Sequence, residues 1–377
     1  MSPEVLTWIV RAMVFILCLL TAFAYLTYLE RRVLSWFQWR VGPNRVGPWG
    51  LFQPLADGLK TILKQEMIPM KADKALYMIA PVITFTAGLA MFGVIPVGRE
   101  VWLSNVAVGA LIFLALSSFG AYGLIIAGWA SQSKYPFLGA LRSCAQVISY
   151  ELSLGLALLV PILIVGSLNI YDIGNIYRSP NWNPWYFIPL TLAFILFLIS
   201  ALAETGRVPF DLPECESEIV AGYHTEYSSM KYAMFPMGEY VAMCGMSAVA
   251  VHMFLGGWHV PFMSDDILLH LVGDAAWGPP AVLFGMGQEY ANALSLTAIG
   301  LVTTLVFLVK VLFIILIFMW IRATEPRFRY DQLMGFGWKR LLPAGLALVL
   351  LTAVILVLLP DPEAGAKALE VSQYVQR

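Results

Sequence analysis

Long apolar stretches alternate with short polar segments along this chain of 377 residues. A helix needs roughly 20 apolar residues to cross about 30 Å of hydrocarbon. No alternating repeat typical of barrel strands occurs, so each stretch is expected to cross the bilayer as a helix. The predicted spans are about 6–29, 75–97, 105–128, 144–167, 185–203, 232–257, 299–321 and 341–360. The sequence therefore predicts an all-α polytopic membrane protein made of a single transmembrane domain.

The segment 258–298 leaves the number of spans open. It contains Pro261, Pro279 and Pro280 among apolar patches, so a ninth span or a re-entrant piece is an alternative to eight spans. The first stretch runs directly into a charged segment and lacks a small-residue cleavage site, which favours a retained helix over a signal peptide. We count eight spans.

The composition is typical of a membrane protein and argues against several kinds of binding or redox site. Hydrophobic residues make up 59% of the chain and charged residues only 12%, whereas soluble domains carry about 25% charged residues. The net charge of −1 argues against a nucleic-acid binder. Four dispersed cysteines predict neither a disulfide framework nor a local metal or iron–sulfur site. The sequence shows no phosphate loop, dinucleotide fingerprint or zinc-protease motif, so no redox or metal site of its own is expected.

Basic residues gather on one side of the predicted topology. With eight spans, the connections 30–74, 129–143, 204–231 and 322–340 share a side, and they hold 17 of the 23 basic residues. The positive-inside rule places these loops in the cytoplasm and both termini in the periplasm of a bacterial inner membrane. A mitochondrial inner membrane, with the loops in the matrix, is the alternative.

The first of these loops contains an amphipathic helix. From Leu51 to Glu66, apolar residues recur at helical spacing, while Asp57, Lys60 and Lys64 fall on the opposite face. Such a helix lies along the membrane surface, either as an anchor or as one wall of an opening for a lipid-soluble ligand. The repeated Gly-Pro pairs before it predict a rigid loop suited to docking.

Carboxylates crowd into the third loop and the helix after it. The 36 residues from Glu204 to Glu239 carry seven of the chain's 24 acids and only two basic residues. Glu214 and Glu216 would also suit the positive N-terminus of a helix begun by Pro213. That interpretation does not explain a carboxylate at the end of one apolar span and another inside the next.

Three ionisable residues fall at predicted membrane depth, namely Glu151, Glu239 and Lys310. Each costs about 2.5–3.5 kcal/mol on insertion scales, so such groups face a bundle interior or a water-filled cavity. A row of them can hold and pass protons near neutral pH. The alternative is a static Glu–Lys pair that only fixes helix packing.

Four loop motifs follow one another in a specific order. The first runs from Glu30-Arg31-Arg32 to Gln53-Pro54-Leu55-Ala56-Asp57, and the others are GWASQSKYPFLGALRSCAQVISYE (128–151), AETGRVPFDLPECESEIVAGYHTEY (203–227) and EPRFRYDQLM (325–334). They resemble the loops of the family formed by the H subunits of respiratory complex I, whose mitochondrial counterpart is NADH dehydrogenase subunit 1. The resemblance runs from about residue 5 to residue 360. The segment 258–298 is longer than is usual in that family, and the tail 361–377 matches nothing in it.

The resemblance implies a place between two arms of a larger enzyme. The implied partners are the peripheral-arm quinone-site and iron–sulfur subunits, which carry the FMN and the clusters, together with other membrane-arm subunits and lipids. This chain would line the tunnel by which quinone, expected to be ubiquinone, arrives from the bilayer. The residues implied for the tunnel and the interface are Arg31, Arg32, Gln38, Arg40, Gln53, Asp57, Phe210, Arg327 and Arg329.

The acidic loop is similar to the start of that family's proton path. By motif position, the implied members are Glu204, Glu214, Glu216, Glu218, Glu226 and Glu239, with Glu151 as a continuation and Lys310 added for its predicted depth. Two alternatives stay open. One is the related membrane subunit of energy-converting hydrogenases, which has no quinone pocket. The other is a free-standing secondary transporter, which predicts inverted repeats and broken helices that the sequence does not show.

Overall fold

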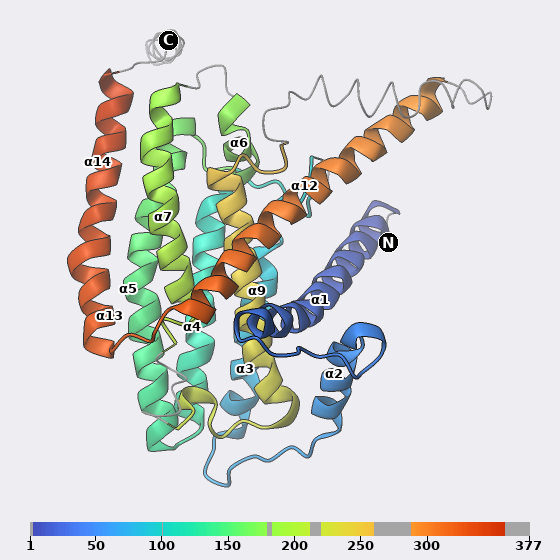
Figure 1. The fold of residues 1–377 in the computed structure, drawn as a ribbon, viewed down its shortest axis with the longest axis vertical. Helices are drawn as coiled ribbons and strands as arrows, with labels where there is room; N and C mark the ends of the chain where they lie inside the picture. Colours follow the sequence, from blue (N-terminus) through green and yellow to red (C-terminus); the bar gives the residue numbers. More distant parts are fainter. Residues whose placement is uncertain (1–2, 100, 179–182, 212–219, 260–287, 359–377) are drawn as a thin grey trace.

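The computed structural model describes the chain except for residues 1–2, 100, 179–182, 212–219, 260–287 and 359–377. For 3–8 and 288–299 it describes the backbone alone. The described residues form helices and loops without a strand (Figure 1), which confirms the predicted all-α class.

Eight helices in the described part of the chain are long and apolar enough to cross a membrane, as predicted. They are α1 (Pro3–Phe37), α3 (Lys74–Met91), α4 (Gly109–Ala130), α5 (Lys134–Val165), α7 (Phe187–Glu204), α9 (Ser229–Phe254), α12 (Gln288–Thr324) and a last segment. That segment joins α13 (Tyr330–Phe336), a π-helical turn (Gly337–Leu341) and α14 (Leu342–Leu358). Most of the stretch considered for a ninth span lies outside the described residues.

Two helices extend beyond their apolar stretches. α1 continues through Glu30 and the two arginines after it to Phe37, and α5 begins at Lys134 rather than near residue 144. Hydropathy marks what lies in hydrocarbon, whereas a helix continues over polar residues whose side chains find partners. The residues around Glu30 therefore belong to a helix and not to an irregular loop.

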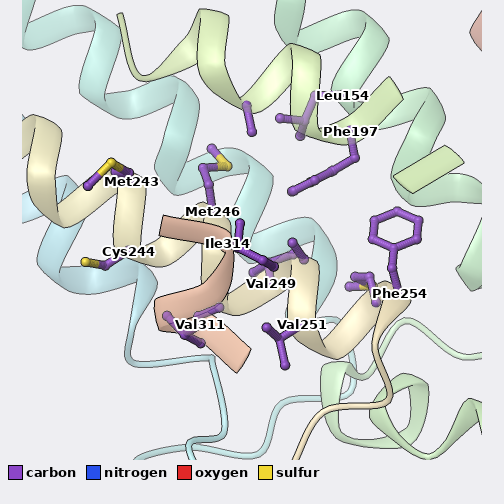
Figure 2. Packing of buried hydrophobic residues seen from close by; sticks show 14 of the residues in the cluster. Leu154, Phe197, Met243, Cys244, Met246, Val249, Val251, Phe254, Val311 and Ile314 are labelled. Atoms are coloured by element: carbon purple, nitrogen blue, oxygen red, sulfur yellow. The ribbon is translucent and has the colours of Figure 1, made fainter. Parts of the chain in front are cut away.

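α9 lies at the centre of the bundle and contacts α3, α7 and α12. Of the most apolar part of this helix, 67% is buried, against 11% for α1. Figure 2 shows Met246 and Val249 of α9 packed among Leu154 of α5, Phe197 of α7 and Ile314 of α12. The core of the molecule is thus built around one helix.

α1 lies at the edge of the bundle, and α12 crosses the bundle diagonally (Figure 1). Their outward faces are apolar and exposed, as at Leu17 and Leu305, which are both 63% exposed. Apolar surface of this extent marks contact with a membrane.

The predicted amphipathic helix forms as α2 (Gln53–Leu63), which lies beside α1. None of its residues is buried, and Leu55, Leu59 and Ile62 are exposed. Its polar face carries Asp57, which is paired with α1 as described below. α2 is therefore a surface helix, consistent with the amphipathic pattern.

α3 and α4 approach closely because Gly123 has no side chain. A Cβ atom at this position would clash with Thr84 and lie 2.9 Å from the carbonyl oxygen of Ala80. Small residues allow helices in a membrane to pack at such short distances. The α3–α4 pair forms one wall of the cavity described next.

Replacing Gly123 tests this packing. Gly123→Ala is expected to lower the apparent Tm of the detergent-purified protein by several degrees, since overpacking costs about 1–3 kcal/mol. Gly120→Ala on the same helix is the matched control, because a Cβ there meets nothing within 4 Å. An equal Tm for the two variants would contradict the close α3–α4 contact.

Candidate functional site

A cavity with several polar residues in a mainly apolar wall lies between α3, α4, α5, α7 and α9. Its interior measures about 80 Å³, and a water molecule needs about 10–15 Å³ on this measure, so the cavity has room for several. The polar residues in its wall are Thr84, Ser117, Ser143, Gln146, Glu204, Thr205, Tyr223 and Glu239. Titratable and hydrogen-bonding groups from five helices and one loop therefore meet in a space of water dimensions.

Two of the predicted proton-path carboxylates, Glu204 and Glu239, line this cavity. Glu204 is the last residue of α7, and Glu239 lies in α9 one turn after Pro236. The Tyr223 hydroxyl donates a hydrogen bond to Glu239 Oε1 at 3.1 Å. Glu204 Oε2 is buried and accepts no hydrogen bond from the described residues. That oxygen is available to water in the cavity.

Glu151 of α5 extends the group of carboxylates. It accepts a hydrogen bond from Ser118 of α4, and it lies close enough to Glu204 for the two charges to repel each other. Three predicted carboxylates thus come from three neighbouring helices: Glu204 and Glu239 line the cavity, and Glu151 interacts electrostatically with Glu204.

The structure places the remaining path candidates differently. Glu226 is half-buried outside the cavity wall, and its backbone carbonyl accepts a hydrogen bond from Tyr77 at 2.7 Å. Glu214, Glu216 and Glu218 lie outside the described residues. Their part in a proton path stays a prediction.

Lys310 of α12 binds the far end of α9 rather than the cavity. Its Nζ donates hydrogen bonds to the carbonyl oxygens of Leu255, Gly257 and His259, at 2.8, 3.0 and 2.8 Å. These carbonyls follow the last turn of α9, where a helix leaves acceptors unpaired. The ammonium group satisfies them and fixes α12 against α9.

The tunnel candidates of the first loop form a hydrogen-bonded joint between α1 and α2. Arg31 Nη1 donates to Asp57 Oδ2 at 2.7 Å, and Gln53 Nε2 donates to Asp57 Oδ1 at 2.9 Å. Arg32 Nη2 donates to the carbonyl oxygen of Trp49 at 2.8 Å. This joint sets the angle between the surface helix and the span.

Gln38 and Arg40 lie on the exposed surface after α1. Arg40 Nε donates a hydrogen bond to Gln38 Oε1 at 2.6 Å, and Trp39 between them is 98% exposed. These residues belong to a surface and not to a closed site within this chain.

Phe210 and Arg327 come together, whereas Arg329 does not join them. Phe210 is buried, and its ring lies 5.5 Å from that of Tyr150 and 5.6 Å from that of Phe328. Arg327 pairs with Asp211 at 3.0 Å. Arg329 forms an exposed pair with Asp331. The turn after α7 is thus held from one side by α5 and from the other by the segment before α13.

Glu30 forms a buried ion cluster that the sequence does not reveal. Its two oxygens accept hydrogen bonds from Arg207 Nη1 at 3.0 and 3.1 Å, and Oε1 also pairs with Arg322. The Arg207 guanidinium lies 4.2 Å from the centre of the Tyr240 ring. The cluster therefore joins α1, the turn after α7, α9 and α12.

Neighbouring groups stabilise the charged Arg207 guanidinium in this cluster. Burial by itself lowers the pKa of Arg207, but the charges of Glu30 and Glu239 and the Tyr240 hydroxyl together outweigh that effect, so the pKa is raised above its ordinary value. Glu30 and Arg207 are 177 positions apart. The sequence contains no local signal for such a pair, and the apolar pattern assigned Glu30 to a loop.

Comparison with known proteins places most of the chain in one family. The family model described as NADH dehydrogenase matches residues 10–353. The H subunit of the NADH-quinone oxidoreductase of Rhodospirillum centenum is 46% identical over 339 residues, covering 90% of both chains. The NADH-quinone oxidoreductase subunit 8 of Thermus thermophilus is 43% identical over 360 residues, covering 93% of this chain and 88% of the relative.

The buried and the exposed ion pairs predict different stability losses. Glu30→Ala leaves two arginines without their carboxylate and should cost about 3–5 kcal/mol. Asp57→Ala removes the half-exposed pair with Arg31 and should cost about 1 kcal/mol or less. Apparent Tm values of the purified chain check this order. Equal losses in the two variants would show that the Glu30 cluster does not hold the helices together.

Proposed function

The chain belongs to the NADH dehydrogenase family of NADH-quinone oxidoreductase subunits, and we propose that it links quinone reduction to proton movement in that enzyme. Reducing a quinone to a quinol takes two electrons and two protons. The electrons would come from FMN and iron–sulfur clusters in partner subunits, because this sequence offers no motif for holding them. The chain itself would supply the route for quinone and the first part of a proton path.

The α1–α2 joint supports the quinone part. α2 is an amphipathic surface helix whose apolar face is exposed, and Asp57 on its polar face is fixed to Arg31 and Gln53. A lipid-soluble ligand moving from the bilayer into a site between subunits would pass along such a helix. The exposed Gln38 and Arg40 surface would then face the peripheral arm.

The cavity between α3, α4, α5, α7 and α9 supports the proposed proton path. Glu204 and Glu239 line a cavity with room for water, and Glu151 lies beside Glu204. Carboxyl groups joined by water can exchange protons without moving the backbone. A path built from coupled carboxylates responds as a group when charge changes at one end.

The acidic loop 204–226 is the proposed coupling element. It begins at a cavity carboxylate, Glu204, and continues within a few residues to Phe210 and Asp211, which are held against Phe328 and Arg327. A change of charge at the quinone site would shift this loop between two arrangements and bias the protonation of the cavity carboxylates. Coupling of two sites through one two-state element has this form.

The location and partners follow from the same proposal. The basic loops would face the cytoplasm of a bacterial inner membrane and dock the peripheral arm, while exposed apolar helix faces would contact lipid and other membrane-arm subunits. Ubiquinone is the quinone we expect. The family match favours this enzyme over an energy-converting hydrogenase or a free-standing transporter.

Replacing Glu239 tests the proton path. In the assembled enzyme in proteoliposomes, Glu239→Gln should slow NADH-driven proton transport at least about tenfold, because an amide cannot carry the proton. NADH oxidation by a hydrophilic artificial acceptor should stay at the wild-type rate. The matched control is Glu325→Gln, an exposed carboxylate outside the cavity. Full proton transport by the Glu239 variant would refute the path.

Replacing Arg32 tests the route for quinone. Arg32→Ala removes a hydrogen bond to Tyr28 at 3.0 Å and one to the Trp49 carbonyl, which frees the loop before α2. NADH oxidation with a long-tailed quinone should fall by roughly five- to tenfold. Reduction of the artificial acceptor should not change. A parallel loss of both activities would indicate failed assembly of the complex instead.

A further inference from the structure

Gln146 of α5 joins the proposed quinone side to the proton side through its amide group. It is only 1% exposed. Its Nε2 donates two hydrogen bonds, to the carbonyl oxygen of Ala203 at 2.7 Å and to that of Phe210 at 2.9 Å. Ala203 directly precedes Glu204. One side chain therefore holds both ends of the turn that connects a cavity carboxylate to a tunnel candidate.

A glutamine suits this geometry. The carbonyl of Ala203 belongs to the last turn of α7, where it otherwise accepts a long backbone hydrogen bond, 3.4 Å from Gly206 N. Both amide hydrogens of Gln146 are donated to these two carbonyl oxygens. A carboxylate of the same length would instead place its own acceptor oxygens against them, and no hydrogen bond would form. An asparagine is shorter by one methylene and cannot reach both carbonyls from the same position on α5.

Gln146 is also part of the cavity wall. Gln146 lines the cavity together with Glu204 and Glu239. Its Oε1 is buried and accepts no hydrogen bond from the described residues. Because both donors are committed to the turn, this oxygen is left to accept a hydrogen bond from cavity water or from a protonated carboxyl group.

α5 supports the turn at a second point. Tyr150 lies one helical turn after Gln146, on the same face. Its ring contacts Phe210, and its hydroxyl donates a hydrogen bond to the Leu333 carbonyl at 2.9 Å. The position of Phe210 is thus defined by α5 through both its backbone and its side chain.

We propose that Gln146 is a positioning residue that transmits movement of the Phe210 turn to the Glu204 carboxyl. A displacement of Phe210 pulls on an amide that also holds Ala203, so the end of α7 moves with the turn. Without the amide, the turn and the carboxylate respond separately. The inference rests on the proposed function, since it assigns to Glu204 a role in proton transfer.

Two variants test this role in the assembled enzyme reconstituted in proteoliposomes. Gln146→Leu removes both donors. Gln146→Glu keeps the length, and its protonated form regains one donor in acid. The measurements are NADH oxidation by a hydrophilic artificial acceptor, kcat and KM with a long-tailed quinone, and protons moved per NADH, each followed across neutral pH.

For Gln146→Leu, kcat with quinone should fall by roughly tenfold, together with the number of protons per NADH, while the artificial acceptor is reduced at the wild-type rate. Gln146→Glu should show the same defects at alkaline pH and recover towards acid pH, which a mere loss of packing would not produce. Ser153→Ala removes a different fully buried polar group from α5 and should change none of these quantities.

Three results would overturn the inference. They are a wild-type kcat and stoichiometry in Gln146→Leu, an equal loss with the artificial acceptor, or a lower quinone kcat at unchanged protons per NADH. Glu204→Gln is measured in parallel. Normal stoichiometry in that variant would refute the proposed proton role of the cavity, whereas the acid recovery of Gln146→Glu decides the positioning role by itself.

Discussion

The buried carboxylate of Glu30 pairs with two arginines and so links α1 to α12 and to the turn after α7. Removing one partner of such a cluster leaves an uncompensated charge in a low-dielectric interior, which is far more costly than losing a surface pair. Glu30, Arg207 and Arg322 come from α1, the turn after α7 and α12. Because Arg207 also lies against Tyr240 of α9, α1 cannot move independently of α9, which carries Glu239.

α5 serves as the common support on the other side of the cavity. Its residues from Gln146 to Glu151 reach different neighbours in turn: the ends of the turn after α7, Trp338 of the π-helical turn through Ser149, and Ser118 of α4 through Glu151. π-helical turns place side chains off the regular helical spacing and are frequent at functional sites. Trp338 reaches α5 from such a turn. α5 thus fixes several irregular segments.

Sequence patterns predicted the features that depend on neighbouring residues in the chain. Hydropathy predicted the helices and their number, and helical periodicity predicted α2, because both are properties of contiguous residues. Sequence patterns could not predict which side chains from different helices come together. Glu204 and Glu239 were each recognised, but their shared cavity depends on how α7 and α9 rotate against each other. Lys310 was placed at membrane depth, yet hydropathy could not show that its partners are three carbonyls beyond α9.

The binding of Lys310 has a consequence for how the central helix responds to the membrane voltage. The Lys310 side chain donates three hydrogen bonds to carbonyls beyond the last turn of α9, and this attachment ties a basic group to the core of the bundle. Moving one elementary charge through 100 mV is worth about 2.3 kcal/mol. Any displacement of α9 along the membrane normal therefore performs electrical work, even when no proton crosses.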